Sequence, residues 1–242
     1  MFKACQAPGI LPSLMRWFIS VVSAPFYLGP ALFLAPFSYP AAMGLMKRWV
    51  SLQLHIFKIQ VHVEDRNQGV YNNPPYLFVH LNQASLIEVL PYVVAMPVPF
   101  RMFMNIGYVL LPFVGWLLWL LGGVAIFRQW RWQALRGLKK TARRMRRGMN
   151  FGISIEGQRS RDGQLQRYKK GALILAREAG ATLVPLVMRG ARERLPFGEW
   201  RVRPGSVEAV FDQVITPVEI ASLDNETLLH RLKTIAERET HF

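Results

Sequence analysis

Residues 76–90 read YLFVHLNQASLIEVL, and this stretch predicts a β-strand, a polar loop and the start of a helix. The run from Tyr76 to His80 is short and apolar, as is typical of a buried strand. Ser85 and Glu88 have the S-x-x-E spacing of a capping box, in which the glutamate accepts the N–H of the residue that caps the helix. A buried strand followed by a capped helix indicates an α/β protein.

The rest of the chain continues this alternation. Strands are expected at 57–63, where Phe57, Ile59, Val61 and Val63 alternate, and at 124–127, 152–155 and 183–188. One helix is expected to run to Arg177, and a surface helix is expected at Asn225–Arg238, with Asp224 as its cap. The predicted fold class is therefore α/β, with a mixed, largely parallel sheet flanked by helices and preceded by an N-terminal apolar helical hairpin.

The N-terminal hairpin is expected because 30 consecutive residues, Trp17–Met46, carry no charge. This length reaches the thickness of a bilayer, but prolines at 25, 30, 36 and 40 favour a broken, interfacial hairpin over a straight span. A true span and a buried helix pair of a soluble protein remain alternatives. A cleaved signal peptide is not expected, because the apolar run is too long and is interrupted by prolines. The predicted domains are a membrane-associating hairpin at 1–50 and a second domain at 51–242.

A second uncharged run, 102–127, is followed by a strongly basic segment, 128–147. Pro112 and the Gly122–Gly123 pair divide the uncharged run into a buried helix and then a strand. The basic segment has nine Lys or Arg residues and no acid, and Leu135, Leu138, Ala142 and Met145 form one helical stripe. Its charged face is either a solvated surface over a packed core or a surface that lies on anionic phospholipid.

Composition limits the partners. The chain of 242 residues carries a formal charge of +15, and 51% of its residues are hydrophobic, which excludes disorder and favours anionic partners such as membrane lipid, an acidic carrier protein or nucleic acid. No nucleic-acid-binding motif is present. The single Cys5 and five scattered histidines (55, 62, 80, 230 and 241) do not have the spacing of a metal site.

Four blocks appear in order along the chain: NQASLIE (82–88), GVAIFR (123–128), EGQRSRDG (156–163) and VPLVMRG (184–190). Together they resemble the glycerolipid acyltransferases of the 1-acylglycerol-3-phosphate acyltransferase family, over residues 76 to about 215. The resemblance implies an enzyme in which a histidine, oriented by an aspartate, removes the proton of a lysolipid hydroxyl that attacks an acyl thioester.

The chain departs from the family pattern N-H-x-S-x-x-D at both functional positions. Gln83 stands in place of the histidine and Glu88 in place of the aspartate. An amide is no base near pH 7, although the Gln83 N–H can bind an oxyanion or a substrate oxygen. His80 is the nearest replacement, but it reaches the site only if the loop folds back, and otherwise it is a strand-end imidazole satisfied by the backbone. Glu88 is either a base with a raised pKa or only part of the capping box.

The other matched positions imply substrate binding. Arg128 and Arg159 match family arginines that bind phosphate. The alternative for Arg128 is that it is only the first residue of a basic helix, and the alternative for Arg159 is that it belongs only to a charged turn. Glu156, Gly157 and Ser160 belong to the third block, and Pro185 is expected to shape the pocket wall.

The predicted function is transfer of a fatty acyl group from acyl-CoA or acyl carrier protein to the hydroxyl of a lysophospholipid. No cofactor and no metal are expected beyond the acyl donor as co-substrate. The expected location is the cytoplasmic face of the inner membrane, with anionic lipid as a partner and no nucleic acid. A non-catalytic, lipid-binding relative is the alternative, and a basic nucleic-acid-binding membrane protein is a remote one.

Overall fold

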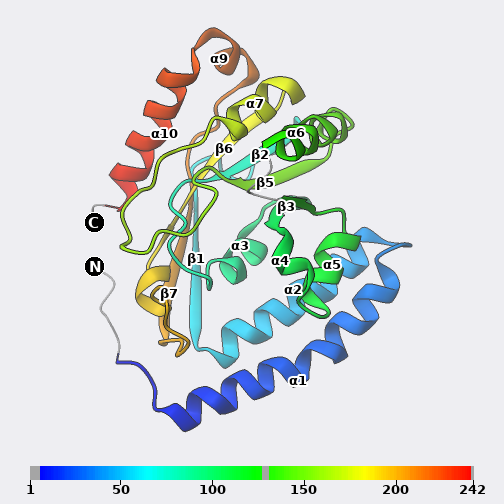
Figure 1. Ribbon diagram of the computed structural model, residues 1–242, viewed down its shortest axis with the longest axis vertical. Helices are drawn as coiled ribbons and strands as arrows, with labels where there is room; N and C mark the ends of the chain where they lie inside the picture. Colours follow the sequence, from blue (N-terminus) through cyan, green and yellow to red (C-terminus); the bar gives the residue numbers. More distant parts are fainter. Residues whose placement is uncertain (1–5, 127–130, 241–242) are drawn as a thin grey trace.

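The computed structural model describes residues 6–126 and 131–240, which form one seven-stranded sheet with helices on both faces (Figure 1). The strands are β1 Ile59–Asp65, β2 Tyr76–His80, β3 Phe100–Asn105, β4 Val124–Ile126, β5 Asn150–Ser154, β6 Thr182–Arg189 and β7 Gly205–Phe211. The helices are α1 Ile10–Leu34, α2 Tyr39–Ile56, α3 Val89–Ala95, α4 Ile106–Val109, α5 Val114–Leu120, α6 Arg131–Met145, α7 Gly171–Ala179, α8 Ala191–Arg194, α9 Pro217–Ser222 and α10 Asn225–Thr240.

The sheet has the strand order β1-β7-β6-β2-β5-β3-β4. Every neighbouring pair is parallel except β6 and β7, which are antiparallel. The five strands from β6 to β4 therefore end at the same edge of the sheet. In such sheets, binding sites lie outside the carboxyl ends of the strands.

Alternate residues of the strands support two cores. On one face Phe78 packs in a cluster with residues of α1, α2 and α3, and on the other face Leu77 and Val79 pack with residues of α6, α7 and α10. Figure 1 shows the two helical layers, with α1–α3 below the sheet and α6, α7 and α10 above it. The fold class predicted from the sequence is confirmed.

The N-terminal segment is a hairpin of α1 and α2, but it is broken only once. Pro25 and Pro30 lie inside α1, so the expectation that they break the helix is wrong. Each of these prolines removes one N–H donor, while the helical turns on either side still close. The chain reverses at residues 35–38, and Pro40 then occupies the first turn of α2, where a missing N–H costs nothing.

Helix α1 exposes most of its apolar surface. It is long and apolar enough to cross a membrane by length and composition, yet few of its residues are buried. Helix α2 continues to Ile56 across position 50, where the sequence places its domain boundary, and packs on α3 and β1. Helix α2 therefore belongs both to the hairpin and to the α/β part of the chain. The division into functional domains stays a prediction.

Two local expectations change, and a third is confirmed. Phe57 ends α2, and the first strand begins at Ile59. The uncharged run 102–127 begins inside a strand, β3, and continues as α4, α5 and β4. Without apolar alternation, a buried strand and a buried helix cannot be separated by pattern. The basic segment does form a helix, α6, which buries Leu138, Ala142 and Met145 as predicted, whereas the Leu135 side chain lies outside the described part.

The hairpin offers a matched test of burial. Leu28→Ala should lower the free energy of unfolding by about 2–4 kcal/mol, because Leu28 is 1% exposed in the cluster that joins α1 to the sheet. Phe26→Ala, two residues away on the same helix and 74% exposed, should change it by less than about 0.5 kcal/mol. Urea unfolding in a mild detergent measures both values, and equal losses would contradict this packing of α1.

Candidate active site

The candidate site lies at the carboxyl ends of β2 and β5. His80 is the last residue of β2, and Ser154, the last residue of β5, is its neighbour in register. The loop 81–88 then leads into α3, and the loop 155–170 leads into α7. Both loops therefore begin at the same point of the sheet, where the sequence blocks 82–88 and 156–163 meet.

Polar side chains hold the first loop in place. The Asn82 side chain donates to the Met188 carbonyl (2.6 Å) and accepts from the Met188 N–H (2.9 Å), at the end of β6. Ser85 Oγ donates to the Leu195 carbonyl at 2.7 Å, and the Tyr168 hydroxyl donates to the Leu81 carbonyl at 2.8 Å. Sequence reasoning did not single out Asn82, although its place beside Gln83 in the first block was the available signal.

Glu156 joins the two loops. It is buried, and its two carboxylate oxygens accept the N–H groups of Gln83 (2.8 Å) and Gln166 (2.7 Å). Burial raises the pKa of Glu156 to about 7, while these two hydrogen bonds oppose the shift. The third-block glutamate therefore acts on the site by positioning its main chain.

Glu88 carries one satisfied and one free oxygen. Oε1 accepts the N–H groups of Ala84 (3.1 Å) and Ser85 (3.0 Å), which is half of the predicted capping box. The other half, a hydrogen bond from the Glu88 N–H to Ser85 Oγ, is absent from the described residues. Ser85 Oγ accepts the Ile87 N–H instead. Glu88 Oε2 is buried, and within the described residues it has no hydrogen-bond partner.

His80 faces this free oxygen. Its Nε2 lies 3.7 Å from Glu88 Oε2, and both side chains are about 5% exposed. Within the described chain His80 Nε2 also lacks a hydrogen-bond partner. A separation of 3.7 Å is too long for a hydrogen bond. The His80 nitrogen and the Glu88 oxygen therefore face each other, and no hydrogen bond is made between them. The fold-back that His80 requires is present, because the loop 81–88 returns Glu88 to the end of β2.

Burial sets the protonation states of the pair. It raises the pKa of Glu88 to about 8, against the hydrogen bonds from Ala84 and Ser85, and the charge of Arg159 also opposes this rise. Burial lowers the pKa of His80 to about 4, while the Asn82 side chain opposes the change. At neutral pH the pair therefore holds a protonated carboxyl group and a neutral imidazole.

Gln83 is fixed through its main chain. Its N–H binds Glu156, and its carbonyl accepts the Ser160 N–H at 2.7 Å. Its carboxamide is partly buried and makes no hydrogen bond with the described residues that would hold it in one orientation. Whether this amide binds an oxyanion stays a prediction.

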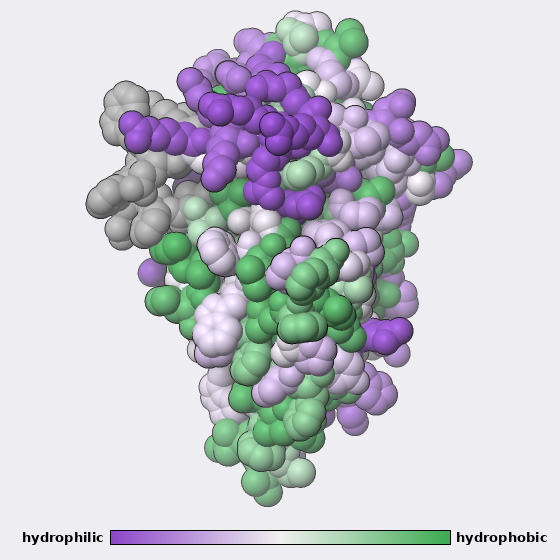
Figure 2. All heavy atoms as spheres, turned by 90° about the vertical axis from the view of Figure 1, so that its right-hand side faces the viewer, coloured by the Kyte–Doolittle hydropathy of each residue, from purple (hydrophilic) through white to green (hydrophobic). Residues whose placement is uncertain are grey.

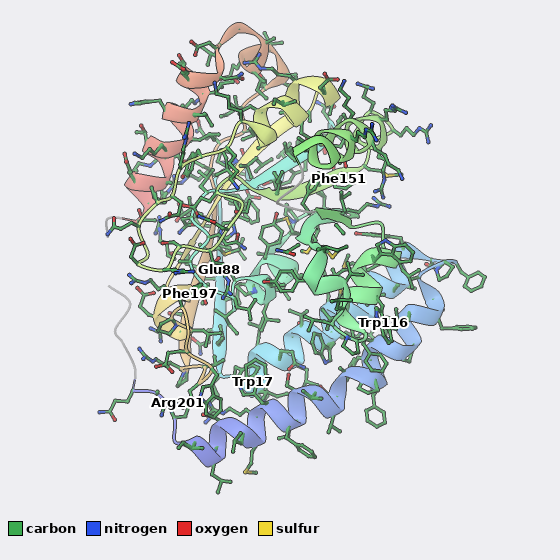
Figure 3. The ribbon with its side chains drawn as sticks, viewed as in Figure 1. Trp17, Glu88, Trp116, Phe151, Phe197 and Arg201 are labelled. Carbon is green, nitrogen blue, oxygen red and sulfur yellow. The ribbon has the colours of Figure 1, made fainter. Side chains whose placement is uncertain are left out.

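Arg159 stands next to this centre. Its guanidinium lies 5.0 Å from the ring centroid of Phe197, and its charge reaches Glu88. In Figure 3 the labels of Glu88 and Phe197 appear in the same part of the view. No carboxylate of the described ranges forms an ion pair with Arg159. The guanidinium therefore rests on an aromatic face and keeps donors for an anion.

Ser160 and Gly157 shape the turn that presents Arg159. Ser160 Oγ donates to Asp162 at 2.8 Å and accepts the Gly163 N–H at 2.9 Å, so these residues form a turn, which is the alternative interpretation of this segment from its sequence. Gly157 has a φ of 70°, and a Cβ atom there would lie 2.8 Å from Lys169 Nζ.

Two predicted residues are not part of this cluster. Pro185 lies inside β6 beside Val79 of β2, and its carbonyl accepts the Asp212 N–H, so a role in the pocket wall stays a prediction. Arg128 lies outside the described residues. In the ranges that are described, no group of three or more His, Cys, Asp or Glu residues is placed to hold a metal ion.

The sequence of the chain is similar to those of known proteins. The family model described as Acyltransferase matches residues 58–189, more than half of the chain. The 1-acyl-sn-glycerol-3-phosphate acyltransferase LPAT1, chloroplastic, of Arabidopsis thaliana is 25% identical over 75% of this chain, which spans about half (51%) of that relative. The 1-acyl-sn-glycerol-3-phosphate acyltransferase of Haemophilus influenzae is 22% identical over 79% of this chain and 78% of its own.

A solved structure shares the fold. The crystal structure of the 1-acyl-sn-glycerophosphate (LPA) acyltransferase PlsC from Thermotoga maritima superposes with a TM-score of 0.80 and 21% identity, covering 96% of this chain and 95% of that one.

The buried proton on Glu88 gives a test of stability. From about pH 4.5 to 8 the unfolded chain releases this proton while the folded chain keeps it, so the ionisation of Glu88 costs the wild type stability as the pH rises. Glu88→Gln should remove this loss, and its stability relative to wild type should increase from pH 5 to 8, by up to about 4 kcal/mol. Thermal unfolding across this range measures the difference. A pH-independent difference would contradict a raised pKa.

Proposed function

The chain belongs to the acyltransferase family, and on this premise we propose that it transfers a fatty acyl group from a thioester to the hydroxyl of a lysophosphatidic-acid-type lipid. The acceptor follows the names of the relatives, which are 1-acyl-sn-glycerol-3-phosphate acyltransferases. The donor is acyl-CoA or acyl carrier protein, since both present the acyl group as a thioester.

The observation that carries this proposal is the pair of free atoms, His80 Nε2 and Glu88 Oε2, at the carboxyl end of β2. Buried polar atoms without partners are rare and cluster at functional sites. Glu88 stands in place of the family aspartate, and the imidazole that faces it comes from the strand, at His80, and not from position 83.

The reaction needs one proton transfer in each direction. The lipid hydroxyl binds beside His80 Nε2 and ionised Glu88 Oε2, and it gives its proton to this pair as its oxygen attacks the thioester carbon. The tetrahedral intermediate collapses, the C–S bond breaks, and the proton passes from the pair to the leaving sulfur. The Gln83 amide donates a hydrogen bond to the oxyanion of this intermediate.

Arg159 binds the phosphate of the acceptor. Its guanidinium fork suits phosphate oxygens, and it is held on Phe197 within electrostatic reach of Glu88. We assign Arg128 the same task as a second ligand.

Attachment to a membrane completes the proposal. Helix α1 presents large exposed apolar residues on the outside of the hairpin, among them Leu14, Phe18, Val22 and Phe26. An amphiphilic acceptor lies in the bilayer, so a hairpin set into its cytoplasmic face brings the site to its substrate.

The pH dependence and four variants test the base. Because the active form requires ionised Glu88, kcat/KM for acyl transfer to lysophosphatidic acid should rise with pH up to about 8 and then level off. His80→Ala and Glu88→Gln should each lose at least about 10²-fold, and Gln83→Ala should lose less. An inactive wild type together with transfer by the Gln83→His/Glu88→Asp double variant would show instead a lipid-binding relative that lacks a base.

Arg159 has a neighbour that serves as its control. Arg159→Ala should lower kcat/KM by roughly 30- to 1,000-fold, because it leaves a lipid phosphate without its guanidinium partner. Arg161→Ala should lose less than about fivefold, although Arg161 also lies over Phe197, at 5.5 Å, because its side chain is exposed. Equal losses would remove Arg159 from the phosphate site.

A further inference from the structure

Two arginines meet at Gly122, outside the candidate active site. Arg101 is the second residue of β3, and Arg144 is the last but one of α6. A Cβ atom on Gly122 would overlap Arg144 Nη2 and would lie 3.0 Å from Arg101 Nε. Both guanidinium groups therefore lie against the same bare stretch of backbone, which a side chain would close.

This pair has no counter-charge. The whole segment 89–155 contains no Asp or Glu, and no ion pair of the described residues includes either arginine. Both side chains are partly buried, and Arg101 Nε is buried without a hydrogen-bond partner in the described chain. Instead, Arg101 lies over the ring of Tyr39 at 4.7 Å and Arg144 over the ring of Phe151 at 5.1 Å.

Two adjacent cations in a partly dry site repel each other. Burial lowers the pKa of Arg144, and the charge of Arg101 lowers it further. A bound anion removes this repulsion, and two guanidinium forks match the oxygens of a phosphate group.

The surroundings indicate where that phosphate comes from. On one side, exposed apolar residues cover the tip of the hairpin and α4–α5, including Phe33, Phe37, Leu110, Trp116 and Trp119. On the other side lies the exposed basic face of α6. Figure 2 looks onto this surface, where hydrophilic residues gather in the upper part and hydrophobic residues lie below them. The arginine pair stands at this boundary, since Gly122 lies two residues after the end of α5 and Tyr39 follows the hairpin turn.

We propose that Arg101 and Arg144 bind the phosphate of an anionic membrane phospholipid, whose chains lie against the hairpin tip and α4–α5. The site is separate from the candidate active site. Arg101 is in register with Phe151, which is also level with Leu77, about 10 Å before His80 along the strands. Arg144 belongs to α6 on one face of the sheet, whereas His80 packs near Tyr92 of α3 on the other. This inference rests on the proposed membrane attachment and goes beyond the proposed reaction.

The test compares two variants of the full chain that lose the same charge. Arg101→Gln/Arg144→Gln removes the pair, and Arg136→Gln/Lys139→Gln removes two exposed cations of α6. Partition of each protein is measured by sedimentation with neutral phosphatidylcholine vesicles and with vesicles containing 30% phosphatidylglycerol, at constant ionic strength. The pair variant should lose at least tenfold on anionic vesicles, the control less than threefold, and neither should change on neutral vesicles.

Several outcomes would overturn the proposal. Equal losses by the two variants would mean that only the general basic field matters. A fall of wild-type partition to the level of the pair variant in 20 mM inorganic phosphate would mean a site for free phosphate. If the pair variant partitions like the wild type but transfers the acyl group more slowly from acyl carrier protein, and not from acyl-CoA, the partner of the arginines is an acidic protein. A wild type that binds neither kind of vesicle would refute the membrane attachment itself.

A second variant guards against misfolding. Arg101→Lys/Arg144→Lys keeps both charges and loses the planar forks, so it should lose about threefold or more on anionic vesicles while remaining folded. Wild-type partition by this variant would contradict a phosphate site built from guanidinium groups. Its melting temperature without vesicles should stay within a few degrees of wild type, because the pair makes no ion pair within the described residues.

Discussion

The buried carboxylate of Glu156 holds together the two loops on which the candidate site depends. It accepts N–H groups from both loops, and the loop 81–88 is further fixed by the hydrogen bond between the Gln83 carbonyl and the Ser160 N–H. Both contacts of residue 83 use main-chain atoms. The path of the loop therefore does not depend on the side chain at this position, and a glutamine in place of the family histidine leaves the scaffold in place. Under the proposed function, the chemistry is decided by the group that faces Glu88.

Acidic residues that could neutralise the basic side chains are unevenly distributed in the protein. At the edge formed by β1 and β7, buried Asp212 and Glu239 pair with Arg66 and Arg238, and these cations are neutralised. Along 89–155 no acid is available, and the cations of α6 stay uncompensated within the described residues. Ten of the 30 Lys and Arg residues thus belong to a segment without acids, which also carries the exposed apolar residues of α4–α5. That combination suits an anionic membrane surface.

Much of the fold could be predicted from local pattern, because buried strands such as Tyr76–His80 are short apolar runs with clear ends. The strand Phe100–Asn105 could not, since it carries an arginine and lacks apolar alternation. At the site, the sequence blocks indicated the two loops that meet at the ends of β2 and β5, while the roles of their residues stay predictions. The sequence pattern could not predict the contact of Arg159 with Phe197, which lies 38 positions away, or the meeting of Arg101 and Arg144. Such contacts follow from tertiary packing.

The two departures from the family pattern have one geometric explanation under the proposed function. A base at position 83 would lie in the loop, near the carboxylate that follows it. With the imidazole moved three residues back, to the end of β2, the carboxylate must hold the N–H groups of Ala84 and Ser85 and still reach across to His80. Glutamate is longer than aspartate by one methylene group, and its Oε2 stands 3.7 Å from the imidazole. Gln83 and Glu88 are then not two separate losses, because relocating the base requires the longer acid and releases position 83 for an amide donor.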